Sequence, residues 1–271
     1  MKNLLKYRLA SLKEGRFYFI AFLALALLFV FWIFVYFITR GVSSLDNPYS
    51  LRSTSPIEKA FFFSSCHNTL LATLPTLSFF LGTGLEYLFI SSDYEKKRLK
   101  MVFGTYLGKR RFYLNAIFVS NLIGMLIIFS YWLLFAALSS PLWMINAVEG
   151  NVFFSVLITL LCSLVLFWFS LFLSGLFGIM SKNGVFAVIF CISLYLVAVF
   201  YTMISLTVTP PKDVSSFSFE LSVIEKNPLA GLVLLNRYGN ISTLWDHLTL
   251  GFITLPPLFL LGMYVYGKKE V

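Results

Sequence analysis

Long apolar runs, separated by short polar segments, dominate the chain. A helix that crosses ~30 Å of hydrocarbon needs about 20 mostly apolar residues, and six stretches are long enough. They are Phe17–Thr39, Thr69–Ile90, Phe112–Leu138, Val152–Met180, Val185–Val208 and Leu248–Tyr266. The pattern therefore predicts an all-α integral membrane protein, with six transmembrane helices in a single domain over residues 1–271.

Two shorter elements are expected outside these spans. Leu5, Leu9 and Leu12 recur at helical spacing among basic residues, which indicates an interfacial amphipathic helix before the first span. A frayed basic tail is the alternative.

The prolines inside the second and sixth spans, Pro75 and Pro256-Pro257, are expected to interrupt those helices.

The long segment before the last span contains a second short element. Asn227 and Pro228 have the residue types of a helix cap and a first helical position. The apolar residues that follow, among them Leu232 and Leu235, are too few to cross a bilayer. We expect a short re-entrant outer helix that acts as a lid over the exit side.

The composition places the basic residues at membrane boundaries. The chain is 59% hydrophobic and 12% charged, with a formal net charge of +9. Its Lys and Arg lie between apolar runs rather than on one face of a soluble domain, which argues against nucleic acid as a partner. Fifteen of the 21 fall on one side of the predicted spans: Lys2, Lys6, Arg8, Lys13, Arg16, Lys96, Lys97, Arg98, Lys100, Lys109, Arg110, Arg111, Lys182, Lys268 and Lys269. The positive-inside rule therefore predicts that both termini are cytoplasmic.

The loop after the second span has a pattern beyond its charge. Ser92 and Glu95 have the spacing of a capping box, which predicts that a helix begins there. Its apolar residues recur at i, i+3, i+4 and i+7: Leu99, Val102, Phe103 and Tyr106. Such a stripe on a cytoplasmic helix favours a protein partner. The alternative is that the loop only anchors the topology.

The same loop resembles that of permeases of type-two ABC exporters. Asp93-Tyr94-Glu95 is followed by alternating basic and apolar residues, a turn, Lys109 to Arg111 and an aromatic entry into the next span. The basic entry helix, Asn227-Pro228-Leu229 and the tail from Tyr266 to Glu270 are also similar to that family.

The resemblance implies a coupling helix that docks on a separate ABC ATPase subunit. Its contact residues would be Asp93, Tyr94, Glu95 and the apolar stripe defined above. It further implies a homodimer, or a pair with a related permease, among the lipids of the cell membrane. ATP and Mg would be bound by the partner subunit, because this chain has no P-loop and so is not expected to be an enzyme.

Glu86 is the one formal charge inside a predicted span, near its inner end. Two interpretations stay open: the side chain snorkels or pairs with a basic residue of the loop, or it takes part in gating.

His67 and His247 have no second ligand at metal spacing, so we expect no metal site and no cofactor in this chain. The resemblance, which the capped amphipathic loop supports, implies an ATP-driven exporter. The aromatic, uncharged spans favour an amphipathic substrate such as a peptide, drug or lipid. The alternatives are an ion-coupled secondary transporter and a non-transporting membrane scaffold or immunity protein.

Overall fold

The computed structural model describes residues 56–91, 109–145, 151–208, 227–234 and 241–268, and every element in them is helical. In chain order the elements are α3 (Pro56–Glu86), the π-helix η1 (Tyr87–Ser91), α6 (Lys109–Ile145), α7 (Asn151–Ser181), α8 (Gly184–Val208), α10 (Pro228–Leu234) and α11 (Ile241–Lys268).

Four of these helices are long and apolar enough to cross a membrane. The stretches are Thr73–Ser91, Lys109–Ala137, Phe153–Ser181 and Thr243–Lys268. They coincide with the second, third, fourth and sixth predicted spans, which confirms that the described part of the chain is all-helical and suited to several membrane crossings. The fifth predicted span is α8, whose apolar stretch among the described residues, Gly184–Val199, is shorter. The first predicted span and the amphipathic entry helix lie outside the described residues.

The prolines do not break their helices, so that expectation was wrong. α3 continues through Pro75, and α11 continues through Pro256 and Pro257. A proline removes a backbone hydrogen bond and crowds the preceding turn. In a membrane bundle the neighbouring helices and local adjustments of the backbone can hold such a helix together.

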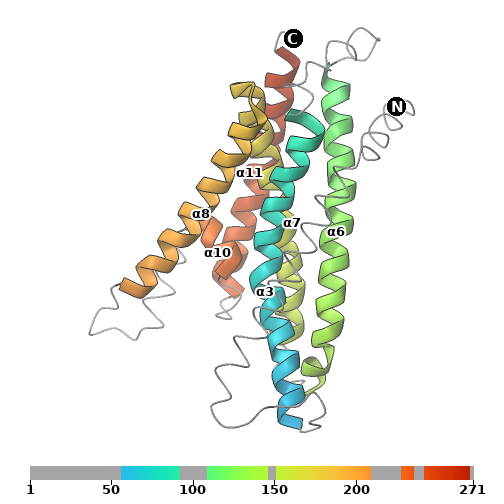
Figure 1. The fold of residues 1–271 in the computed structure, drawn as a ribbon, viewed down its shortest axis with the longest axis vertical. Helices are drawn as coiled ribbons and strands as arrows, with labels where there is room; N and C mark the ends of the chain where they lie inside the picture. Colours follow the sequence, from blue (N-terminus) through green and yellow to red (C-terminus); the bar gives the residue numbers. More distant parts are fainter. Residues whose placement is uncertain (1–55, 92–108, 146–150, 209–226, 235–240, 269–271) are drawn as a thin grey trace.

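The long helices run side by side (Figure 1). α7 contacts α3, α6, α8 and α11, and α3 also packs along α6. α8 leaves the bundle obliquely toward its C-terminal end, and the short α10 lies between α8 and α11 (Figure 1). α10 contacts α3 and α7 as well. Helix α7 is therefore the central element of the described fold.

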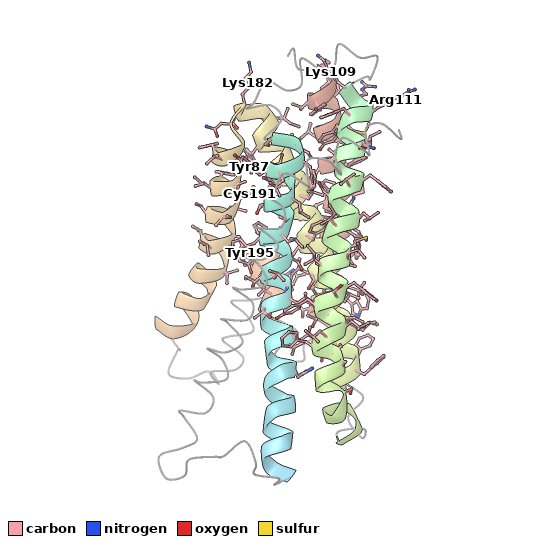
Figure 2. The ribbon with its side chains drawn as sticks, turned by 45° about the vertical axis from the view of Figure 1, so that its right-hand side comes forward. Tyr87, Lys109, Arg111, Lys182, Cys191 and Tyr195 are labelled. Carbon is pink, nitrogen blue, oxygen red and sulfur yellow. The ribbon has the colours of Figure 1, made fainter. Side chains whose placement is uncertain are left out.

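One end of the bundle, here called the basic end, carries most of the positive charge. α3 with η1, α7 and α11 end there, and α6 and α8 begin there (Figure 1). Five of the six Lys and Arg in the described ranges belong to these termini: Lys109, Arg110, Arg111, Lys182 and Lys268. Figure 2 shows three of them, Lys109, Arg111 and Lys182, at this end. The sixth, Lys59, lies in the first turn of α3, at the other end of the bundle.

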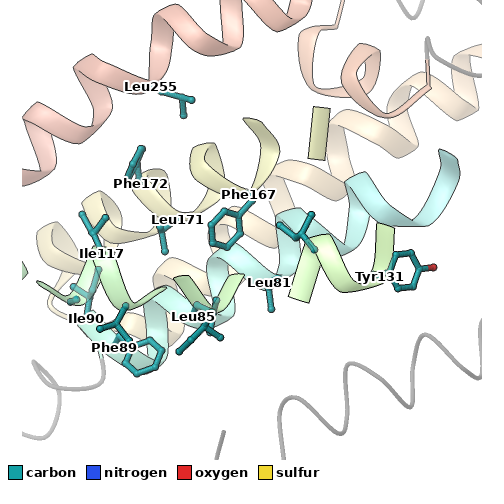
Figure 3. Packing of buried hydrophobic residues seen from close by; sticks show 14 of the residues in the cluster. Leu81, Leu85, Phe89, Ile90, Ile117, Tyr131, Phe167, Leu171, Phe172 and Leu255 are labelled. Carbon is teal, nitrogen blue, oxygen red and sulfur yellow. The ribbon is translucent and has the colours of Figure 1, made fainter. Parts of the chain in front are cut away.

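Apolar side chains fill the space between α3, α6, α7 and α11 (Figure 3). Leu85 and Phe89 come from the α3–η1 segment, Ile117 from α6 and Phe167 from α7, and each is at most 5% exposed. Outward-facing positions are also apolar: Phe118, Ile189 and Ile253 are all more than half exposed. An apolar interior together with an apolar exterior is what a lipid solvent permits.

Side-chain hydrogen bonds add links between the helices. The hydroxyls of Thr73 and Tyr131 are 2.6 Å apart and join α3 to α6, and those of Thr76 and Tyr195 are 2.7 Å apart and join α3 to α8. Trp168 Nε1 on α7 donates to an oxygen of α6. Each such bond between membrane helices contributes on average ~0.6 kcal/mol.

Candidate functional site: a buried carboxylate at the basic end

The structure describes only some of the residues that the sequence singled out. The seven coupling residues between Asp93 and Tyr106 lie outside the described residues, and so does Leu235. The loop that holds the seven leaves the described fold at Ser91 and returns at Lys109, and both residues are at the basic end. Glu86, Asn227, Pro228 and Leu232 are described.

Glu86 is the last residue of α3, and its side chain is 0% exposed. Ser91 Oγ donates to Glu86 Oε1 at 2.6 Å, and Ser174 Oγ donates to Oε2 at 3.0 Å. Hydroxyls that donate to a carboxylate make short, charge-assisted bonds. Because the side chain faces the interior, Glu86 does not snorkel to solvent. Pairing with Lys96, Lys97, Arg98 or Lys100 of the loop concerns residues outside the described ranges.

The π-helix explains how Ser91 reaches Glu86. A π-helix pairs residue i with residue i+5, whereas an α-helix pairs i with i+4. Glu86 and Ser91 are five residues apart, and η1 is the turn between them. The wider turn therefore places the Ser91 hydroxyl over the carboxylate. Single π-turns occur often at functional sites.

Glycines make room for this turn. A Cβ at Gly178 would lie 2.2 Å from Ser91 Oγ, and one at Gly184 would lie 2.3 Å from Ser91 Cβ. A Cβ at Gly175 would meet the Glu86 side chain at 3.6 Å. A side chain at 178 would therefore force the Ser91 hydroxyl to turn away, and one at 184 would displace Ser91 and Tyr87 of η1.

The small residues spaced by four on α7 face α3 and η1. A Cβ at Gly82 would lie 2.0 Å from Ser170 Oγ, Ser174 bonds to Glu86, and Gly178 meets Ser91. Small residues allow two helix backbones to approach closely in a membrane. In the described structure this stripe therefore packs within the chain.

Polar groups of two further helices border the carboxylate. Cys191 on α8 is fully buried and interacts with Ser174 and Glu86. The hydroxyl of Tyr113 on α6 would lie 3.7 Å from a Cβ at Gly175, and the Tyr113 ring packs against Tyr266 of α11 with centroids 4.9 Å apart. Tyr87 and Cys191 both lie toward the basic end (Figure 2). The cluster therefore joins every long helix of the described fold.

A two-residue turn connects α7 to α8 beside this cluster. Lys182 has a φ of 59°, the left-handed conformation that often ends a helix. Asn183 then caps α8, because its Oδ1 accepts from Phe186 N at 3.0 Å. Gly184, the first residue of α8, packs on Tyr87 and Ser91. The turn is thus in direct contact with η1.

The short helix α10 begins where the sequence predicted. Its first residue is Pro228, and Asn227 Oδ1 accepts from Ala230 N at 3.3 Å. Asn227 Nδ2 also donates to Ala198 O at 3.1 Å, which ties the cap to α8. Leu232 is 4% exposed and packs in a cluster with residues of α3, α7, α8 and α11.

Comparison with family models, curated proteins and solved structures finds no match.

The sequence pointed to Glu86 but not to its partners. Ser91 and Ser174 are common residue types in membrane helices, and nothing in their spacing from Glu86 predicts a contact if an α-helix is assumed. Ser170, Ser174 and Gly178 are spaced by four in the sequence, but this spacing does not say what they pack against. In the described structure the buried hydrogen bonds of Glu86 hold the end of α3 against α7.

Proposed function

We propose that the chain is the permease subunit of an ATP-driven exporter of the type-two ABC class, working as a dimer with separate ATPase subunits. In this proposal the chain has six spans, the basic end is cytoplasmic, and α10 is the re-entrant outer helix. The substrate is amphipathic, in keeping with apolar, aromatic spans that carry one buried charge.

One observation carries the proposal. The loop with the capping box and apolar stripe follows Ser91 directly, and Ser91 is bonded to Glu86, a carboxylate buried between the helices near the basic end. A loop that only anchored the topology would need charge at the membrane surface, and no attachment to the core. A loop that transmits force from a motor needs such an attachment.

The loop itself provides the test. Leu99→Glu or Phe103→Glu places a charge in a contact that would otherwise be desolvated, which costs about 1–3 kcal/mol or more for an unpaired polar group. Neutralising Lys96 and Lys97 together removes only charges at the solvated edge of the proposed contact, and each such charge contributes roughly 0–1 kcal/mol to binding. We therefore expect the first two variants to release the ATPase and the double variant to retain it.

The measurement is vanadate-sensitive ATP hydrolysis in the complex purified through the tagged permease, with membrane insertion checked in parallel. A topology anchor predicts the reverse order, in which loss of the lysines disturbs insertion and the apolar positions hardly matter. If the complexes of both glutamate variants hydrolyse ATP at the full rate of the parent, the loop is not a coupling helix.

Glu86 favours one other function, an ion-coupled secondary transporter, because a buried carboxylate in a span can carry a proton or cation. Transporters of that kind usually place several ionisable groups or broken helices near mid-membrane. Glu86 instead is the last residue of α3, and α3 ends at the basic end (Figure 1). Export that persists without ATP but collapses with the proton gradient would favour this second function.

A further inference from the structure

Glu86 holds two pieces of the chain that are far apart in sequence. Ser91 follows it on η1 and Ser174 lies 88 residues away on α7, and each bonds to a different carboxylate oxygen. We propose that Glu86 is a positioning residue that clamps η1 onto α7, so that movement of the loop after Ser91 is passed to the α7–α8 turn. The proposal rests on the function proposed above.

The clamp stabilises a turn that has little local stability. π-helices are rare and occur mostly as single turns, so η1 needs support from its surroundings. The hydrogen bond from Ser91 to Glu86 joins the two ends of the turn. The absence of side chains at Gly178 and Gly184 lets the turn pack closely against α7 and α8. Without the carboxylate, an ordinary α-helical turn would carry Ser91 away from this position.

The same contacts connect the loop to α7. Ser174 and Gly178 are one turn apart on the face of α7 that meets Glu86 and Ser91. α7 ends three residues after Gly178, and the tight turn returns the chain to Gly184, which also packs on Ser91. Displacement of Ser91 must therefore move the α7–α8 turn, because tightly packed side chains transmit strain.

A carboxylate suits this role better than an amide. An ionised carboxylate presents two acceptor oxygens and no donor, so it can bind both hydroxyls at once. A glutamine has the same shape but presents one oxygen and one NH₂ group. With glutamine, only one of the two serine hydroxyls can still donate a hydrogen bond to residue 86, because the NH₂ group is a donor.

A disulfide tests the geometry independently of any partner. The Cβ of Ser91 and the Cβ position at Gly178 are 3.4 Å apart, close to the ~3.5–4.5 Å typical of disulfides. We expect the pair Ser91→Cys and Gly178→Cys to cross-link under mild oxidation. Ser91→Cys with Gly175→Cys is the matched control, because a side chain at 175 meets Glu86 and Tyr113 instead. Equal cross-linking of the two pairs, or none in the first, would overturn the clamp.

Coupling is measured in the assembled complex through a cysteine at Lys182, an exposed residue of the α7–α8 turn. Cys66 is replaced by alanine, and the buried Cys162 and Cys191 are kept. In inside-out vesicles, ATP with vanadate should change the rate at which a maleimide labels this position. We expect Ser91→Ala, Ser174→Ala and Glu86→Gln each to reduce that change by about tenfold, the order expected for one hydrogen bond to a charged group.

Ser170→Ala is the matched control. Ser170 lies one turn from Ser174 on α7 and is equally buried, but its hydroxyl donates to its own helix at Phe167 O. It should leave the nucleotide response unchanged. If the Ser174 variant behaves like the Ser170 variant while the complex still hydrolyses ATP, the clamp is wrong and the proposed function stands. If the parent complex shows neither hydrolysis nor a nucleotide response, the proposed function fails and the role of the clamp fails with it.

Discussion

Gly82 and Gly84 lie two residues apart on α3, yet only Gly82 touches α7. A Cβ at Gly82 would lie 2.5 Å from Phe167 O, a backbone atom that cannot turn away, whereas a Cβ at Gly84 meets nothing within 4 Å. We expect Gly82→Ala to destabilise the fold by roughly 1–3 kcal/mol, the usual cost of overpacking. Gly84→Ala should be neutral or stabilising by up to about 1 kcal/mol, because alanine favours a helix.

The thermal unfolding midpoint of the two variants in the same detergent measures this difference. Equal midpoints would show that α3 and α7 are not in backbone contact at Gly82. The pair also shows what the sequence leaves open at this scale. Both positions hold the same small residue, and residue type alone cannot say which one faces a neighbour.

The environment of Glu86, a charged residue, was likewise not predictable from residue type. Its burial could not be derived from the sequence, because a carboxylate near the end of a span can reach either water or the interior. The hydroxyls that decide the matter are five residues away through a π-turn and 88 residues away on α7. Neither separation follows from helical periodicity.

Among the elements, α10 was the most predictable, because its start is encoded locally. The Asn-Pro pair satisfies the free amides of the first turn without any help from the rest of the fold. By contrast, the backbone hydrogen bonds of η1 span one residue more than those of the α-helix assumed for the second span. Its cause is tertiary: the carboxylate and the glycines of α7 and α8 hold it.

Asn227 performs two tasks that substitutions can separate. Its Oδ1 caps α10 and its Nδ2 donates to Ala198 O of α8. Asn227→Ser keeps a capping oxygen and loses the bond to α8, whereas Asn227→Ala loses both. We expect the alanine variant to be less stable than the serine variant by about 0.5–2 kcal/mol, the usual contribution of a cap.

The unfolding midpoints of the parent and both variants in detergent separate the two contributions. A serine variant that matches the parent would mean that the bond to α8 contributes nothing. Identical serine and alanine variants would mean that the cap contributes nothing and that packing alone, through residues such as Leu232, holds α10 in place.

At the scale of the whole molecule, hydrophobic pattern and charge predicted the class of fold. Apolar length identified the four helices that could cross a membrane, because bilayer thickness fixes the length of a span. Charge predicted that α6, α8 and the end of α11 share a basic end, and the described bundle has that arrangement. How the helices pack was not predictable, because in lipid the contacts depend on small residues and hydrogen bonds rather than on apolar periodicity.

The orientation of the basic end follows from the same charge asymmetry. Lys and Arg are retained on the cytoplasmic side during insertion, so Ser92 and Lys182 should be cytoplasmic, while Ser215, between α8 and α10, should be outside. With Cys66 replaced by alanine, a membrane-impermeant thiol reagent added to intact cells should label Ser215→Cys. It should reach Ser92→Cys and Lys182→Cys only in inside-out vesicles. The two basic-end positions control for each other, because the bundle places η1 against the α7–α8 turn. Labelling of both from outside would invert the orientation and put the loop after Ser91 where no ATPase could reach it.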